Sequence, residues 1–543
     1  MSALESSAAG VSVRVDGPAA EAAAAAAKAL TDDGVPAKLA AGDPTLWGPD
    51  AQAEAEIRLG WLNLPRSSRE LLPQLDALVA RVRDAGLDHV VLAGMGGSSL
   101  APEVITATAG VDLTVLDTTD AEQVRRALKD RPLRTVLVVS SKSGGTVETD
   151  SHRRIYEQAF REVGLSDDDI ARRIVAVTDP GSPLDTIARE AGYEVVLADP
   201  NVGGRYSALT AFGLVPSALA GVNVAALLDD AAAVAPSLAA GTAANPALLL
   251  GAALGGYAVD AGHDKILIAD AGSGISGFGD WAEQLIAEST GKQGRGLLPV
   301  VVESPMADGF RAAPDAHRVT LGGDGTATDT VVSGPLGAQF LVWEYATAVA
   351  GRLLGIDPFD QPNVQESKDN TTKLLASAGD GPLTTDEPVL TDGDVEVYGP
   401  PELLSGAGDL GGVIDALLAA IPDSGYLAVM AYLDRIGEPE AARLREILAA
   451  RTVHPVTFGW GPRFLHSTGQ YHKGGPQRGV FLQVTGAVPD DLQVPGRPYT
   501  LGRLQTAQAL GDMGALSGRN RPTVRLHLRD RARGLAQVLT AAR

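Results

Sequence analysis

The chain has 543 residues, and its 45 Lys and Arg against 67 Asp and Glu give a formal net charge of −22. The length and an apolar fraction of 45% predict several folded domains with large cores and exclude a chain that is disordered throughout. The negative charge repels phosphate backbones and acidic headgroups, so neither nucleic acid nor a membrane is expected as a partner. Since there is no cysteine, disulfides, thiol nucleophiles, iron–sulfur clusters and cysteine zinc sites are excluded.

The N-terminal stretch MSALESSAAG lacks the basic start and apolar centre of a signal peptide, which predicts a cytoplasmic protein. Residues 1–55 are expected to form an N-terminal helical segment, because residues 18–42 are rich in alanine with spaced charges. The longest uncharged stretch, residues 231–259, is interrupted by Pro236, Pro246 and several glycines, so it predicts no membrane span. A buried helix over 246–259 with Asn245 as its N-cap is expected instead.

Two series of short β-branched runs, separated by helix-length stretches, follow along the chain. The first occupies 89–93, 113–116, 135–139, 174–177 and 194–197, and the second occupies 265–269, 298–302, 426–430, 480–484 and 523–528. Runs without polar alternation are typical of parallel strands covered on both faces. The predicted fold is therefore α/β, with two doubly wound parallel-sheet domains in three α/β/α layers, at 56–225 and 226–543. The second is expected to carry extra helices, a C-terminal extension and an exposed excursion over 376–412.

Two glycine- and serine-rich turns follow strands of the first series. In Gly94-Met-Gly-Gly-Ser-Ser99, backbone N–H groups could approach an anion at the start of a helix. Asp117 at the end of the next strand would suit a dinucleotide site, but Ser99 stands where the third glycine is needed, and a ligand-free turn is the other alternative. The third strand ends in Ser140-Ser-Lys-Ser-Gly-Gly-Thr146, whose hydroxyls, lysine and glycines favour phosphate binding over helix capping alone.

Candidate catalytic charges occur in two later segments. Arg205 follows two glycines, where a fixed cation could stabilise an oxyanion. Residues 281–292 predict a helix that ends at Gly291, with Gln284 and Glu288 one turn apart on one face. For Arg205 and Glu288, the alternative interpretation is a solvated position on the protein surface.

Metal and serine-hydrolase sites are not indicated. His466 and His472 are six residues apart, which is not the spacing of a helical zinc pair, so no metal is expected. The segment Gly272-Ser-Gly-Ile-Ser-Gly277 approaches the nucleophile elbow of hydrolases but has its serine misplaced.

Taken in order, these segments resemble the glucose-6-phosphate isomerase family, whose members contain two sugar isomerase (SIS) domains. The matching motifs span roughly residues 90–370 and are Gly94–Ser98, Ser141–Thr149, Gly203–Ser207, Gln284–Lys292 and Pro358–Val364 leading to Lys368, with a further match at His466–Gln470. The resemblance implies reversible conversion of glucose 6-phosphate to fructose 6-phosphate through a cis-enediol(ate), in glycolysis and gluconeogenesis. It also implies a homodimer that needs no cofactor.

By this resemblance, the sugar phosphate would be held by Gly97, Ser98, Ser141, Lys142, Ser143 and Thr146. Glu288 would move a proton between carbons 2 and 1, Arg205 would stabilise the enediolate, and Gln284 would contact a sugar hydroxyl. Lys368 and His466 would open the ring, with His466 reaching the site of the partner subunit. The residue types suit this chemistry, because aldose–ketose isomerisation needs a carboxylate base and a fixed cation.

One motif is displaced from the usual family order, in which the His-Ser-x-Gly-Gln segment precedes Phe-Asp-Gln-Pro. Here His466 follows Lys368, which is most similar to the isomerase half of transaldolase–isomerase fusion proteins. His472 is the alternative ring-opening residue, and a structural histidine on a glycine-rich turn is a further interpretation. Two other functions stay open: a dual-specificity phosphoglucose/phosphomannose isomerase, and a non-catalytic SIS protein that binds a sugar phosphate.

Overall fold

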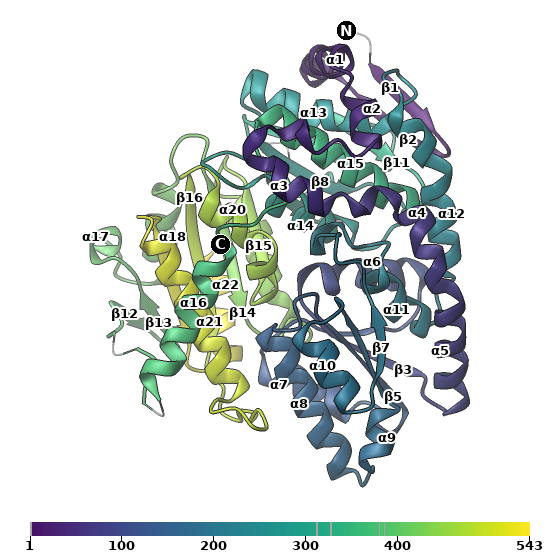
Figure 1. Cartoon of the computed structure of the whole chain (residues 1–543). Helices are drawn as coiled ribbons and strands as arrows, with labels where there is room; N and C mark the ends of the chain where they lie inside the picture. The colour runs from purple at the N-terminus through teal and green to yellow at the C-terminus, as the bar shows by residue number, and fades with distance from the viewer. Residues whose placement is uncertain (1–2, 311–312, 326–327, 380, 385) are drawn as a thin grey trace.

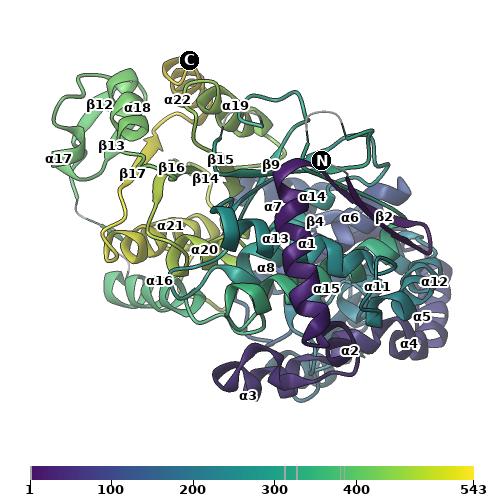
Figure 2. The same ribbon diagram turned by 90° about the horizontal axis from the view of Figure 1, so that it is seen from above.

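The computed structural model describes residues 3–310, 313–325, 328–379, 381–384 and 386–543, which form three β-sheets with helices packed around them (Figures 1 and 2). Each sheet has parallel strands at its centre, so the predicted α/β class of SIS type is confirmed. Residues 226–543, predicted as one domain, supply strands to two of the sheets. None of the described helices is both long and apolar enough to span a lipid bilayer.

The first sheet is wholly parallel, with strand order β4-β3-β5-β6-β7. Its strands coincide with the five predicted runs, because uninterrupted apolar residues suit a sheet covered on both faces. They are β3 (His89–Gly94), β4 (Thr114–Leu116), β5 (Thr135–Ser140), β6 (Ile174–Thr178) and β7 (Glu194–Leu197). The helices around it are α5 (Leu72–Asp84), α6 (Leu100–Ala109), α7 (Ala121–Lys129), α8 (Val147–Glu162), α9 (Asp167–Ala171), α10 (Pro183–Glu190) and α11 (Ala211–Ala220).

The second sheet joins the N-terminus to the middle of the chain, in the order β1-β2-β11-β10-β8-β9. The strands are β1 (Leu4–Ala8), β2 (Val11–Val15), β8 (Lys265–Asp270), β9 (Leu298–Val302), β10 (Ala316–Leu321) and β11 (Thr330–Ser333). Residues 1–55 are therefore not purely helical, since β2 pairs antiparallel with β11 and buries alternate valines. The helices are α1 (Gly17–Asp32), α2 (Val35–Ala40), α3 (Pro49–Arg58), α4 (Leu64–Ser67), α12 (Val224–Val234), α13 (Pro246–Ala261), α14 (Phe278–Thr290) and α15 (Leu336–Leu354).

Helix α13 is the expected buried helix, and the Asn245 side chain accepts a hydrogen bond from the Leu248 backbone N–H at 2.9 Å. The asparagine therefore caps the helix as predicted, since it satisfies one of the unpaired N–H groups of the first turn.

The third sheet is built by the C-terminal part of the chain, in the order β12-β13-β17-β16-β14-β15. The strands are β12 (Leu390–Asp392), β13 (Val395–Tyr398), β14 (Tyr426–Tyr432), β15 (Val456–Trp460), β16 (Gly479–Gly486) and β17 (Thr523–Leu528). The helices are α16 (Val364–Ala378), α17 (Pro401–Leu404), α18 (Leu410–Ala419), α19 (Arg443–Ala449), α20 (Gly469–Gly474), α21 (Leu501–Ser517) and α22 (Arg531–Ala541). The expected exposed excursion over 376–412 is correct only in part, because β13 buries Val395 and Val397 and pairs with β17.

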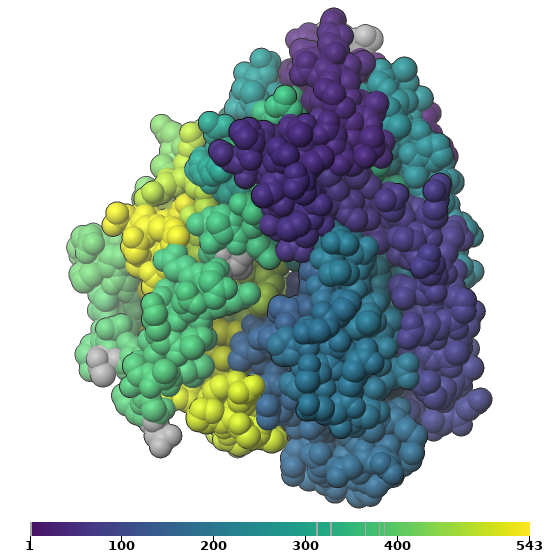
Figure 3. Space-filling model, in the orientation of Figure 1, coloured from purple at the N-terminus to yellow at the C-terminus, as the bar shows by residue number. Residues whose placement is uncertain are grey.

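Shared cores join the three parts of the molecule, which lie side by side in the space-filling view (Figure 3). One core contains Val90 and Leu92 of the first sheet together with Ile266 and Ile268 of the second. Another contains Leu267 and Ala269 on the opposite face of β8 together with residues of β14 and β16. The second sheet thus packs against both of the other parts.

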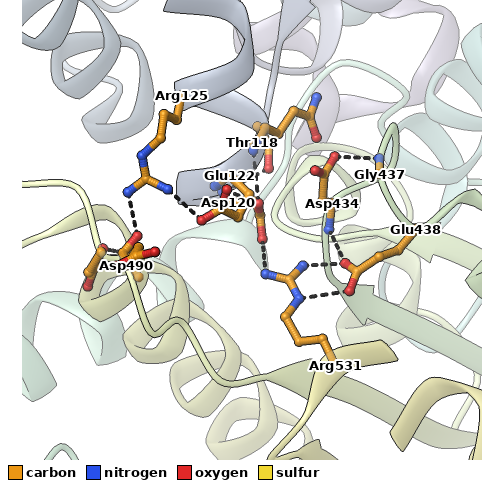
Figure 4. Close-up of polar contacts among 12 residues, drawn as sticks. Thr118, Asp120, Glu122, Arg125, Asp434, Gly437, Glu438, Asp490 and Arg531 are labelled. Carbon is orange, nitrogen blue, oxygen red and sulfur yellow. Dashed lines mark hydrogen bonds and ion pairs between the residues drawn. The ribbon is translucent and has the colours of Figure 1, made fainter. Parts of the chain in front are cut away.

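Arginine–carboxylate contacts also join the third part to the first (Figure 4). The Asp120 carboxylate caps α7 by accepting hydrogen bonds from the backbone N–H groups of Glu122 and Gln123, and it also accepts one from Arg531 of α22 at 2.8 Å. Arg531 also pairs with Glu438, while Arg126 pairs with Asp434 at 2.7 Å. These buried or half-buried charges fix the position of the loop that follows β4.

Candidate active site

The site begins at the carboxyl edge of the first sheet, between β3 and β5. The strand order 2-1-3-4-5 reverses at this point, and open α/β sheets bind ligands where their order reverses. The short turn Gly96–Ser98 (η4) follows β3, and the loop 141–146 follows β5. Both sequence-predicted phosphate segments are therefore neighbours at the reversal point of the sheet.

Glycines in the first turn allow the backbone of other segments to come close. A Cβ on Gly97 would overlap the carbonyl oxygen of Gly204, in the turn Gly204–Tyr206 (η6) that carries Arg205. A Cβ on Gly96, whose φ is +55°, would lie 2.9 Å from the carbonyl oxygen of His466. These contacts bring residues about 110 and 370 positions away against the first sheet.

In the loop 141–146, the hydroxyl groups contact other groups of the loop, whereas the lysine contacts a residue outside it. The Ser141 Oγ and Thr146 Oγ1 atoms lie 2.9 Å apart, and Ser143 Oγ accepts a hydrogen bond from the Gly145 N–H at 3.3 Å. Lys142 Nζ lies 2.6 Å from Asp179 Oδ2, so this lysine is engaged by a carboxylate beside the loop. Burial raises the pKa of Asp179, and the ion pair with Lys142 opposes this effect.

Helix α14 carries two of the predicted residues on its inner face. Gln284 Nε2 donates hydrogen bonds to Glu288 Oε2 at 3.1 Å and to the His466 carbonyl oxygen at 2.8 Å. The other carboxylate oxygen, Glu288 Oε1, lies 3.4 Å from Nη1 of Arg205. Gln284, Glu288 and Arg205 are all buried, so the solvated alternative for both charged side chains is excluded.

Three hydrogen bonds fix the orientation of the Arg205 guanidinium. Nε donates to Ser289 Oγ at 2.8 Å, and Nη2 donates to the carbonyl oxygens of Pro358 and Asp360 at 2.8 and 3.0 Å. Lys292 holds the same segment through Asp360, and burial lowers the pKa of Lys292 to about 8. The guanidinium is thus held by backbone carbonyls, with Nη1 facing Glu288.

A cavity of about 430 Å³ adjoins the loop 141–146, α8, α16 and α21. Its lining includes four sequence-predicted residues, Ser143, Thr146, Lys368 and His466, and it also includes Glu148 and Gln508. His466 Nε2 lies 3.1 Å from Glu148 Oε1 of the same chain. The His466 side chain thus lies in the cavity of its own chain, which favours a role there over the expected role in the partner's site.

Glu148 was not among the predicted site residues, although it belongs to the Ser141–Thr149 motif. It lies in the first turn of α8, where the helix dipole favours a negative charge. Burial alone would raise its pKa, but the nearby charges of His466 and Lys368 lower the pKa to about 2. An acidic residue that follows a phosphate-type loop directly into a helix is the signal that could have found it.

The alternative histidine, His472, lies in the core of the third part. Its Nδ1 is 2.9 Å from the Tyr426 hydroxyl, and its ring contacts the rings of Tyr426 and Phe481. Burial lowers the pKa of His472 well below its ordinary value. It does not line the cavity, so the geometry favours His466.

Most predicted residues converge, although not all of them line the cavity. The residues that do not line it are Gly97, Ser98, Ser141, Lys142, Arg205, Gln284 and Glu288. Among the described residues, no group of three or more His, Asp or Glu side chains is arranged to hold a metal ion. Asp117, considered for a ribose contact, instead accepts a hydrogen bond from Ser99 and pairs with Arg463 at 2.5 Å.

The parallel sheets and this switch-point loop define a fold of the SIS type. A solved structure of a glucose-6-phosphate isomerase from Chlamydia trachomatis has a similar fold, with a TM-score of 0.56 and 20% identity, covering 70% of this chain and 90% of that one. The family model for phosphoglucose isomerase matches residues 81–296.

Curated relatives extend the match along the chain. The glucose-6-phosphate isomerase of Rubrobacter xylanophilus is 30% identical over 394 residues, covering 59% of this chain and 90% of that protein. The probable glucose-6-phosphate isomerase of Haloarcula marismortui is 36% identical over 243 residues, and the matched part is 43% of this chain and 54% of that protein. The chain belongs to the glucose-6-phosphate isomerase family.

Proposed function

We propose that this chain catalyses the reversible isomerisation of D-glucose 6-phosphate to D-fructose 6-phosphate through a cis-enediol(ate). Membership of the family supports this reaction. The single observation that carries it is the separation of 3.4 Å between Arg205 Nη1 and Glu288 Oε1 in a buried site. Proton abstraction next to a carbonyl needs a base and a nearby positive charge, and this pair supplies both without a metal ion.

Substrate binding would begin with the phosphate at the loop 141–146. Ser143 and Thr146 line the cavity and can donate hydroxyl hydrogen bonds to phosphate oxygens. We assign Gly97, Ser98, Ser141 and Lys142 to the same region of the site, with Lys142 leaving Asp179 when a phosphate binds. The N-terminus of α8 adds a partial positive charge beside Thr146.

Ring opening would follow, with His466 and Lys368 at the other wall of the cavity. His466 moves a proton between the ring oxygen and the hydroxyl on carbon 1, which gives the open-chain aldehyde. The Glu148 carboxylate orients the imidazole.

Glu288 would then take the proton from carbon 2 while Arg205 stabilises the negative charge on the enediolate oxygens. The same carboxyl group returns the proton to carbon 1, while the hydroxyl proton on the oxygen of carbon 2 passes to the oxygen of carbon 1, so that carbon 2 becomes the ketone and no net proton is consumed. Gln284 holds the second oxygen of Glu288, which leaves Oε1 to face the reacting carbons.

A coupled assay with purified protein and both hexose 6-phosphates tests this proposal. Turnover of glucose 6-phosphate alone supports it, and turnover of mannose 6-phosphate as well supports the dual-specificity alternative. Binding without turnover of either sugar would contradict the proposed reaction and favour a sugar-phosphate-binding protein.

Assembly and location are further parts of the proposal. We expect a homodimer in the cytoplasm, as the family resemblance implies, although one chain already contains the groups assigned to the site. Sedimentation measurements and fractionation of cells test these two points.

A further inference from the structure

Helix α21 of the third part reaches the cavity with one buried amide side chain. Gln508 is 3% exposed, and its Nε2 donates a hydrogen bond to Glu148 Oε1 at 2.7 Å. Its Oε1 accepts a hydrogen bond from the Thr119 hydroxyl at 2.9 Å. The carboxylate of Glu148 accepts a hydrogen bond and the hydroxyl of Thr119 donates one. These two partners therefore define which end of the amide carries the nitrogen and which carries the oxygen.

Thr119 is itself held in a buried loop between β4 and α7. The neighbouring Asp120 N–H donates to the Thr118 hydroxyl oxygen at 3.0 Å, and the Asp120 carboxylate accepts from Arg531 (Figure 4). On the other side, Asp117 accepts from Ser99. The loop 117–120 is thus fixed from both sides, so the Thr119 hydroxyl provides a rigid anchor for Gln508.

The two groups bound to Glu148 share one of its oxygen atoms. His466 Nε2 and Gln508 Nε2 both approach Oε1, from η9 (Arg463–His466) and from α21 respectively. A carboxylate that is 3% exposed has little water to hold it in place, so its two protein partners determine its direction.

We infer that Gln508 is a positioning residue for ring opening, which holds Glu148 at the angle where it orients His466. This role rests on the proposed isomerase function. The chain of contacts Thr119, Gln508, Glu148, His466 links a loop of the first part, a helix of the third part and the cavity. Gln508 acts on the reaction only through Glu148 and His466, because the hydrogen bonds of its amide go to Glu148 and Thr119.

The role predicts a selective defect in the Gln508→Leu variant. A hydrogen bond to a charged group is worth a factor of roughly 10 to 100, so kcat/KM for glucose 6-phosphate should fall by about that factor. Because ring opening would slow while proton transfer from carbon 2 would not, the primary isotope effect with glucose 6-phosphate deuterated at carbon 2 should fall toward 1. Binding of sorbitol 6-phosphate, which has no ring to open, should stay within about twofold.

Gln505→Leu is the matched control, since Gln505 is a buried glutamine one turn earlier on α21 that does not line the cavity. It should leave both kcat/KM and the isotope effect unchanged. If Gln508→Leu does not fold, Thr119→Val removes the hydroxyl that orients the amide and should give a smaller change in the same direction.

Unchanged kinetics in a folded Gln508→Leu protein would overturn the inference. Equal losses in the Gln505 and Gln508 variants, with the wild-type isotope effect retained, would also overturn it, because they would indicate a structural role. A wild-type protein that turns over no glucose 6-phosphate would instead remove the proposed function on which the inference rests.

Discussion

His466 Nε2 lies 3.1 Å from Glu148 Oε1, although 318 positions separate these residues in the chain. The contact joins the carboxyl edge of the first sheet to the segment after β15, which belongs to the third sheet. A displaced His-Ser-x-Gly-Gln motif therefore reaches the same site within one chain. The third sheet and its helices bring the motif to this site, since η9, α20 and α21 all pack near the cavity.

The first prediction concerns which subunit supplies His466. Glu288→Gln and His466→Ala chains should both be nearly inactive, and mixing them under conditions of subunit exchange should restore no activity. Each site would take Glu288 and His466 from one chain, so every hybrid site would carry one defect. A gain to about half of the wild-type activity per heterodimer would contradict this and indicate exchange of His466 between subunits.

The second prediction concerns the phosphate loop. Replacing Ser141, Ser143 and Thr146 by Ala should raise KM for glucose 6-phosphate more than it lowers kcat, because phosphate contacts act equally on substrate and transition state. Steady-state kinetics measure both values. Ser151→Ala is a control in the same helix region, since that hydroxyl donates to the Val147 carbonyl oxygen and does not line the cavity. A loss confined to kcat would argue against phosphate binding here.

The third prediction concerns Arg205. Lys cannot reproduce the bonds to Ser289, Pro358 and Asp360 together, so Arg205→Lys should lower kcat by about 10²- to 10³-fold. It should also reduce the free energy of unfolding by about 1–3 kcal/mol, because buried carbonyl oxygens lose their partner. Arg69→Lys, at an exposed ion pair with Asp229, should change neither value measurably. Wild-type turnover in the Arg205 variant would exclude the guanidinium from the reaction.

The fourth prediction concerns stability at low pH. The pKa of Glu148 is lowered from 4.5 to about 2 in the folded protein, so its ionised form stabilises the fold above pH 4.5. This contribution is lost as the pH falls from 4.5 through about 2. Unfolding of wild type and Glu148→Gln should therefore differ most above pH 5 and converge toward pH 2. A difference that stays constant from pH 7 to 2 would show that the carboxylate charge is not the cause.

The strands could be predicted where they are apolar throughout, and not where polar residues alternate with apolar ones. All five strands of the first sheet appear in the sequence as β-branched runs. The hairpin β1–β2 and strand β10 contain Ser, Arg and His between apolar residues, so their pattern is weaker. The number of sheets depends on long-range pairing, such as that of β2 with β11, which local pattern does not reveal.

The site was predictable only where a motif carries its residues. Glu288, Arg205 and Gln284 lie within short motifs, and the structure brings them together. Gln508 lies in a helix of ordinary composition, and only tertiary packing places it against Glu148. Lys142 is in the motif but pairs with Asp179, a contact that depends on the neighbouring strand β6 and its following turn.

Proton transfer by Glu288 is the central claim, and the Glu288→Gln variant tests it most directly. Turnover of glucose 6-phosphate should fall by at least about 10²-fold, since an amide cannot accept the proton from carbon 2. The dissociation constant of sorbitol 6-phosphate should stay close to the wild-type value, because the side chain keeps its shape. Turnover near the wild-type rate in this variant would contradict the mechanism.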